Sequence, residues 1–268
     1  MTATAEKSVR APKWTWRDVP LPLGMSLVAT AGLVLWHFSP WTHYMHLTLP
    51  SGGHDHHGGG AEPGMTAMVG LFTGAWLLMT VAHMLPTAIP LLASFRRVAA
   101  RRPERTRLTV VVVAGFLTVW AAAGAAISFA HVHLRYLVEM NSLQAAAPWF
   151  LVATLVAAGA YQFSNYIAKC VTACRSPFSF IGKHWKGGDS VAGQSFRIGL
   201  DYGQSCLGCC AALMVVMFIV GSASHLWMVV FALFGVIQKS ARWGGRLTRP
   251  MGVGFFVAAG VVAALQFL

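Results

Sequence analysis

Five cysteines are the side chains in this sequence best suited to chemistry. Cys206 and Cys209 form a C-x-x-C motif, and Cys210 follows directly. Residues three or four positions apart share one face of a helix, so Cys206 should lie beside both Cys209 and Cys210. Cys209 and Cys210 are adjacent, and we expect their side chains to point in different directions. Cys170 and Cys174 are four residues apart and should share a helix face as well.

Thiolate is a soft ligand that suits Cu(I) and Zn, which makes this cysteine group a candidate metal site. A single C-x-x-C motif also occurs in redox proteins. Cysteine is, in addition, a small residue that packs well between buried helices. The concentration of all five cysteines between residues 170 and 210 favours ligands or redox partners over packing.

Two methionines and a histidine near residue 80 offer further soft donors. Met79 and His83 are four residues apart and share a helix face, and Met84 follows His83. Thioether and imidazole together are compatible with Cu(I), and an ionisable residue in an apolar segment is a functional candidate. The alternatives are that the methionines fill gaps in a core and that His83 bonds a neighbouring helix.

Most of the remaining histidines lie in or beside segments with almost no Lys or Arg. Short His-rich tracts bind Zn, Cu or Ni weakly, and a solvated polar loop is the alternative. These histidines are His37, His43, His46, His54, His56, His57, His131, His133 and His225.

Long apolar segments must position these side chains. The chain has 268 residues, of which 56% are hydrophobic and only 10% charged, a composition too apolar for a soluble domain. A bilayer core of ~30 Å needs about 20 helical residues. We therefore predict an all-α, polytopic transmembrane helix bundle, with Pro86 and Pro90 bending its second span. The seven predicted spans are residues 21–39, 66–95, 108–130, 146–168, 203–221, 223–238 and 251–268.

The charges predict how this bundle is oriented. The net charge is +12, and all of the 20 Lys and Arg residues except Arg135 fall on one side if seven spans alternate. The positive-inside rule then places the N-terminus in the cytoplasm. This explanation of the basic residues leaves no reason to expect nucleic acid as a partner.

This orientation divides the chain into two parts. A cytoplasmic basic arm at 1–20 precedes a single transmembrane domain at 21–268. The domain would carry an outer His-rich loop at 41–64, a second outer loop at 131–146 and an inner Cys-containing loop at 169–202. The cysteines would lie towards the cytoplasm and most histidines outside.

The sequence shows no motif of an ordinary enzyme. It has no Ser/His/Asp set, no Walker loop and no dinucleotide fingerprint. Asp201 and Glu139 are the acids closest to span ends, and neither has a paired carboxylate. We expect no catalytic residues and a non-enzymatic role.

Three stretches resemble a bacterial family of predicted metal-binding integral membrane proteins, sometimes labelled copper chaperones. They occur in the family's order and cover about residues 66–240. They read WLLMTVAHMLPTAIPLLASFRR, YQFSNYIAKCVTACRSPFSFIGKHW and GLDYGQSCLGCCAALMVVMFIVG. The resemblance implies metal handling, with His83 standing where the family has a methionine. The positions that match the family's pattern are Trp76, Met79, Met84, Pro86, Cys170, Cys174, Cys206, Cys209 and Cys210.

These observations together predict a multi-pass metal-binding protein of the bacterial inner membrane. It would be a copper chaperone or an accessory subunit that supplies metal to a membrane complex, with Cu(I) as the ion and zinc as a second candidate. Its partners would be the lipid bilayer and other membrane subunits or a copper-dependent membrane enzyme. One alternative is a non-metal structural subunit of an assembly such as a membrane monooxygenase, since small residues at Ala114, Gly115 and 121–126 allow close helix packing. A third is a thiol redox protein.

Overall fold

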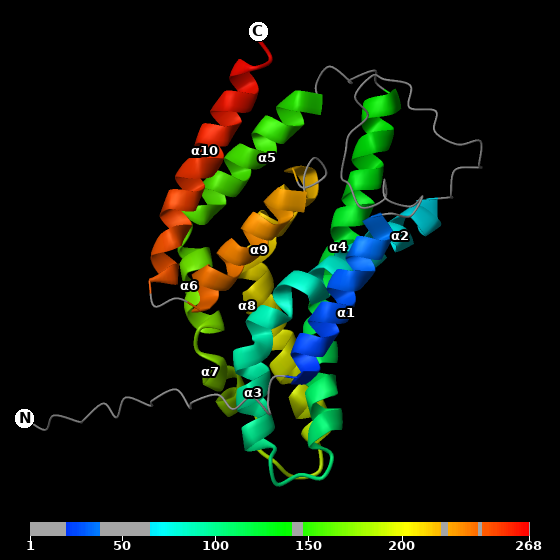
Figure 1. The fold of residues 1–268 in the computed structure, drawn as a ribbon, viewed down its shortest axis with the longest axis vertical. Helices are drawn as coiled ribbons and strands as arrows, with labels where there is room; N and C mark the ends of the chain where they lie inside the picture. The colour runs from blue at the N-terminus through cyan, green and yellow to red at the C-terminus, as the bar shows by residue number, and fades with distance from the viewer. Residues whose placement is uncertain (1–19, 38–64, 141–146, 221–224, 241–242, 268) are drawn as a thin grey trace, which may run out of the picture.

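The computed structural model describes residues 20–37, 65–140, 147–220, 225–240 and 243–267, and all regular structure within them is helical. The all-α prediction is therefore confirmed (Figure 1). The predicted outer loop at 41–64 and residues 1–19 of the predicted arm lie outside the described residues. The helices are α1 (Pro20–His37), α2 (Met65–Met84), η3 (Pro86–Ala88), α3 (Ile89–Val98), α4 (Arg105–Met140), α5 (Ala147–Gln162), α6 (Asn165–Cys174), α7 (Pro177–His184), α8 (Val191–Val220), α9 (His225–Ser240), η6 (Gly244–Leu247) and α10 (Thr248–Ala264).

Every predicted span contains a helix, and the spans at 66–95 and 146–168 are each divided between helices. Within the described residues, fewer than seven helices are long enough to cross a bilayer. In the described part of the chain, four helical segments are long and apolar enough, and a fifth span results if α5 and α6, bent by 67°, are counted as one. The apolar stretch of α1 is shorter, and α9 has 16 residues. The bundle is compatible with a membrane protein, and seven crossings stay a prediction.

Two segments expected as loops are largely helical. Helix α4 continues to Met140, through most of the stretch expected as the second outer loop. The stretch 169–202 contains the end of α6, all of α7 and the beginning of α8. Hydropathy marks where a helix becomes polar, which is not where its backbone hydrogen bonds end. The polar ends of these helices were therefore assigned to loops.

Helices α4 and α8 form the central pair of the bundle. At their crossing, a methyl group on Gly115 would collide with the Phe196 carbonyl oxygen, and one on Gly199 would collide with the Val112 carbonyl oxygen. The backbones therefore approach as closely as glycine permits, as in the small-residue packing expected for this span. This close contact fixes the position of α8, which carries three of the cysteines.

The second predicted span is broken at its prolines, as expected. Helix α2 ends at Met84, η3 spans Pro86–Ala88, and α3 begins at Ile89. Within the break, the Thr87 hydroxyl donates a hydrogen bond to the Met84 carbonyl at 2.7 Å. Helix α9 packs against η3, so the break lies close to the end of α9. Figure 1 shows α3 continuing from this bend to the lower end of the bundle.

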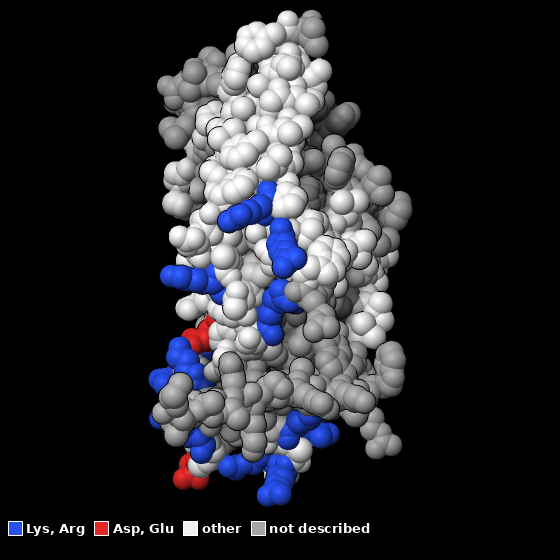
Figure 2. Space-filling view, turned by 90° about the vertical axis from the view of Figure 1, so that its left-hand side faces the viewer, with Lys and Arg blue, Asp and Glu red and all other residues white. Residues whose placement is uncertain are grey.

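The surface is unequally charged along the length of the bundle. In Figure 2 the described Lys and Arg side chains lie over the lower and middle parts of the face, and none is seen among the described residues of its uppermost part. Helix α10 exposes large apolar side chains, among them Val253, Val257 and Val261. Apolar side chains in such numbers on one helix face suit lipid better than water.

Candidate metal centre

Helices α6 and α8 bring all five cysteines into one buried region. Ser164 caps the N-terminus of α6, and its hydroxyl accepts a hydrogen bond from the Ile167 amide at 3.3 Å. This N-cap sets the register of a short helix that buries Ile167, Cys170, Val171 and Cys174 on one face. The predicted shared face of Cys170 and Cys174 is confirmed. All five thiols are free, and the most exposed, Cys170, is only 7% accessible.

The sulfur atoms of the two helices are in contact. The Sγ atoms of Cys174 on α6 and Cys209 on α8 lie 3.8 Å apart. The Cys209 and Cys210 Sγ atoms are separated by 3.3 Å, and the Cys209 thiol donates a hydrogen bond to the backbone carbonyl of Cys206 at 3.2 Å. Four cysteines therefore form one connected cluster, which we call the thiol cluster: Cys174, Cys206, Cys209 and Cys210.

The expectation that Cys209 and Cys210 diverge is wrong. Adjacent helical residues are rotated by about 100° around the axis, which separates their Cβ atoms. Their sulfur atoms still meet, because each Sγ is one rotatable bond beyond Cβ and staggered rotamers can turn two neighbours towards each other.

Cys170 lies at the edge of the cluster, in space that a glycine leaves open. A methyl group on Gly208 would lie 2.5 Å from the Cys170 Sγ, so any side chain there would displace the thiol. The hydroxyl of Tyr166 borders the same space, 3.1 Å from such a methyl group, and Tyr166 is 57% exposed. Cys170 therefore connects the buried cysteines to the surface of the bundle.

The donor set and its spacing fit a soft metal ion. Two sulfur ligands of one tetrahedral ion, with metal–sulfur bonds of ~2.3 Å, lie about 3.8 Å apart. The Cys174–Cys209 separation of 3.8 Å agrees with this value. Within the described residues, no three His, Cys, Asp or Glu side chains already surround a common metal position. A third ligand would therefore need a change of rotamer.

A buried lysine that the sequence did not single out contacts this cluster. The Lys239 Nζ, from the last turn of α9, lies 2.8 Å from the Cys206 Sγ and 3.0 Å from the Thr87 Oγ1. The carbonyl of Thr87 also accepts a hydrogen bond from the Tyr202 hydroxyl at 3.2 Å. Thr87 in the proline break thus bonds to Tyr202 of α8 and to Lys239 of α9, beside the thiols. In the sequence, Lys239 looked like one more basic residue at the end of a span.

Residues 73–262 match the model of the PpoB2 family, which is described as a copper chaperone. The chain belongs to the PpoB2 family. No curated protein and no solved structure matches the chain. The resemblance to a family of predicted metal-binding membrane proteins is confirmed, and the family description supports a copper-related accessory role. The matched region contains all eight predicted ligands, as well as Lys239.

The predicted ligands of α2 lie partly in the same core as the thiols of this PpoB2 chain. Met79 and Met84 are buried in the hydrophobic cluster that contains the cysteines. The half-buried His83 instead turns back to its own helix, with its Nδ1 2.9 Å from the Met79 carbonyl oxygen. The structure thus places the two methionines near the cysteines without bringing His83 to them, and all three ligand assignments stay predictions.

The outer histidines are mostly beyond what the structure describes. His43, His46, His54, His56 and His57 lie outside the described residues, and nothing is described of the side chains of His37, His131 and His225. His133 packs against Phe129, with ring centroids 4.0 Å apart. A metal-binding role of these histidines stays a prediction.

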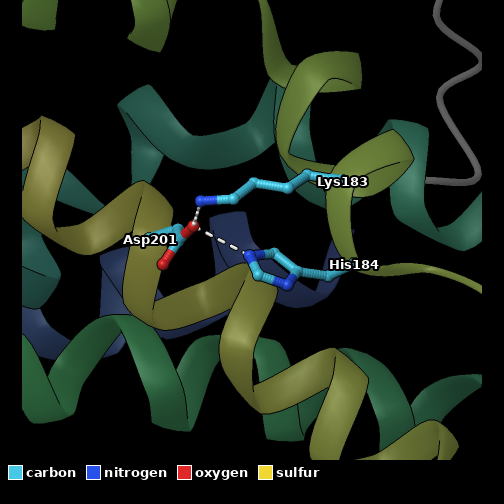
Figure 3. A network of polar contacts seen from close by, with 3 residues as sticks. All are labelled: Lys183, His184 and Asp201. Atoms are coloured by element: carbon cyan, nitrogen blue, oxygen red, sulfur yellow. Dashed lines mark hydrogen bonds and ion pairs between the residues drawn. The ribbon is translucent and has the colours of Figure 1, made fainter.

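Asp201 lies on α8, before Cys206 in the sequence, and connects this helix to α7. Its Oδ2 accepts from the Lys183 Nζ at 2.6 Å and lies 2.8 Å from the His184 Nε2 (Figure 3). Figure 3 shows both side chains reaching from α7 to the carboxylate on α8. The Lys183 side chain is 66% exposed, so this arrangement serves to hold α7 in place at the surface.

Proposed function

We propose that this chain is a membrane-embedded chaperone or accessory subunit that carries Cu(I) on its buried cysteines and delivers it to a copper-dependent membrane enzyme. The observation that carries the proposal is the contact between thiols of two helices in a chain of the copper chaperone family. Copper is the cargo here, and soft thiolates bind Cu(I) in preference to harder ions. Zinc accepts the same ligands, but the family description names copper.

Two further observations support a membrane location. Several helices have the length and apolar composition of membrane spans, and α10 exposes apolar side chains. On the face drawn in Figure 2, the described Lys and Arg side chains are absent from the uppermost part, an asymmetry of the kind that the positive-inside rule predicts for a membrane protein. We place the cysteines towards the basic, cytoplasmic side, because Cys170 and Cys174 lie between Lys169 and Arg175 in the sequence.

The burial of the cluster favours a carrier over a thiol redox enzyme. A redox cysteine must be reached by the disulfide or thiol of its substrate. Cys206, Cys209 and Cys210 are at most 1% exposed. A small metal ion can be handed inward through Cys170 and Cys174, which are less deeply buried.

The test is metal binding by the purified full-length protein under reducing, anaerobic conditions. We expect near-stoichiometric Cu(I) on the wild type and a loss of at least about tenfold in affinity in the double variant Cys206→Ser, Cys209→Ser. The control is Gln204→Ala, which changes an exposed side chain of the same helical turn and should bind as the wild type does.

Three results would overturn the proposal. Wild-type protein that binds no Cu(I) excludes a copper carrier. Co-purification with partner subunits and no metal identifies a structural subunit. A disulfide between Cys206 and Cys209 that forms and breaks during turnover, detected by thiol trapping and mass spectrometry, identifies a redox protein.

A further inference from the structure

Lys239 carries an amine that is buried at the end of α9. Its side chain is 7% exposed, and its Nζ contacts one hydroxyl and one thiol, those of Thr87 and Cys206. Lysine at the end of a membrane helix normally extends its flexible stem to water. Here the stem turns inward, so the bundle must offset the cost of burying an ammonium group.

The thiol cluster is what faces this amine. The Lys239 Nζ contacts the Cys206 Sγ, and Cys206 lies one helical turn from Cys209 and Cys210 on α8. Cys209 in turn contacts Cys174. A cation stabilises a neighbouring thiolate, and a contact of 2.8 Å between Nζ and Sγ is within the range of a charge-assisted hydrogen bond. An ammonium on Lys239 beside one thiolate of the cluster forms a buried pair without net charge.

This balance depends on the charge of the metal that enters. Every ligand binds as the thiolate, so a ligand that is still a protonated thiol gives up its proton to solvent. Two thiolates with one Cu(I) carry a net charge of −1, which the ammonium of Lys239 cancels. Two thiolates with a divalent ion are neutral, which leaves the ammonium as an uncompensated buried charge. A divalent ion restores neutrality only if a third thiolate binds or the ammonium loses its proton, and the described thiols do not yet surround one position.

We propose that Lys239 is a specificity-determining residue, whose ammonium group makes the buried thiol cluster prefer a monovalent ion over a divalent one. This rests on the proposed function, since it requires the thiols to bind metal. Lys239 touches a ligand, Cys206, and acts through the charge that it places beside it.

The experiment compares Cu(I) and Zn(II) affinities of the full-length protein in detergent, using bathocuproine disulfonate and a Zn(II) indicator as competitors. In Lys239→Met, which keeps the length of the side chain and removes its charge, Cu(I) affinity should fall about 10- to 100-fold. Zn(II) affinity should stay within about threefold or rise, so that the preference for Cu(I) falls at least about tenfold. Lys239→Arg retains the charge and should recover most of the preference.

Lys169→Met is the matched control, because it removes the same charge from the exposed face of α6. It should leave both affinities unchanged. Elution as a single species and a wild-type circular dichroism spectrum establish that each variant is folded. If Lys239→Met does not fold, Lys239→Gln replaces it, since the amide can still donate to Thr87 without carrying charge.

The possible outcomes separate this proposal from the proposed function. If the wild type binds no Cu(I), the proposed function fails and this proposal fails with it. If the wild type binds Cu(I) and the uncharged variant binds it equally well, only the role of Lys239 is wrong. An equal loss of both metals would also overturn the proposal, because it would mean that Lys239 merely holds the site together.

Discussion

At the scale of single residues, the thiol cluster depends on side chains that are far apart in sequence. Cys174 and Cys209 are separated by 35 positions, and their contact requires α6 to lie directly against α8. That close approach is possible at Gly208, where the Cys170 thiol occupies the space that a side chain would fill. The position of α6, which carries two of the five thiols, therefore depends on the absence of a side chain at Gly208.

Gly208→Ala should displace Cys170 and weaken the contact between α6 and α8. Overpacking of this kind typically costs about 1–3 kcal/mol, while alanine for glycine inside a helix returns about 1 kcal/mol. The net loss should lower the thermal unfolding midpoint and reduce Cu(I) affinity. The matched control is Gly193→Ala on the same helix, where a methyl group would meet no atom within 4 Å. That variant should be as stable as the wild type or more so, and an equal effect of both substitutions would contradict this account.

The sequence predicted the cysteine pairs within each helix but not the contacts between helices. Helical periodicity was enough to place Cys170 beside Cys174 and Cys206 beside Cys209 and Cys210. Lys239 was not recognisable, because its role depends on how α9 packs against η3 and α8. Basic residues at span ends are expected from topology alone, and nothing in the composition near Lys239 distinguishes it from Arg246 or Arg249.

At the scale of elements, hydropathy located the helices well and their ends poorly. The apolar centre of each predicted span is helical, and the break at Pro86 lies where the proline requires it. The short helices α6 and α7 were missed as separate elements, because each is only two to three turns long and has a polar exposed face. They matter for the site, since α6 supplies Cys170 and Cys174 and α7 packs on α8.

Asp201→Asn should loosen α7 without emptying the metal site. The substitution removes the charge that pairs with Lys183 and His184, but both the carboxylate and the ammonium are partly exposed to solvent. Exposed ion pairs contribute about 0–1 kcal/mol, so global stability should change little. We expect faster amide hydrogen exchange in residues 177–184 and an unchanged Cu(I) affinity. A large loss of copper, with α7 exchanging as in the wild type, would instead make Asp201 part of the metal site.

At the scale of the whole molecule, the distribution of charge is the feature that places the candidate metal centre relative to a membrane. Lys and Arg occupy one part of the face in Figure 2, and in the sequence they cluster at alternate span ends. Seven spans explain the position of every Lys and Arg except Arg135, whereas the described helices include four or five of sufficient length. The two counts differ because α1 and α9 are short for a bilayer core of ~30 Å, a difference that local thinning of the bilayer can absorb.

Reporter fusions to the full-length chain distinguish an odd number of crossings, such as seven or five, from an even number, such as four. With an N-terminus in the cytoplasm, seven crossings place the C-terminus outside. Alkaline phosphatase fused after Leu268 should then be active and green fluorescent protein dark. The same reporters inserted after Glu104, in the basic turn between α3 and α4, should give the opposite result, because that turn belongs to the predicted cytoplasmic side. A fluorescent C-terminal fusion would mean an even number of crossings. The basic residues near α10 and those near α3 would then lie on opposite sides of the membrane. The distribution of charge would no longer support a position of the thiol cluster towards the cytoplasm.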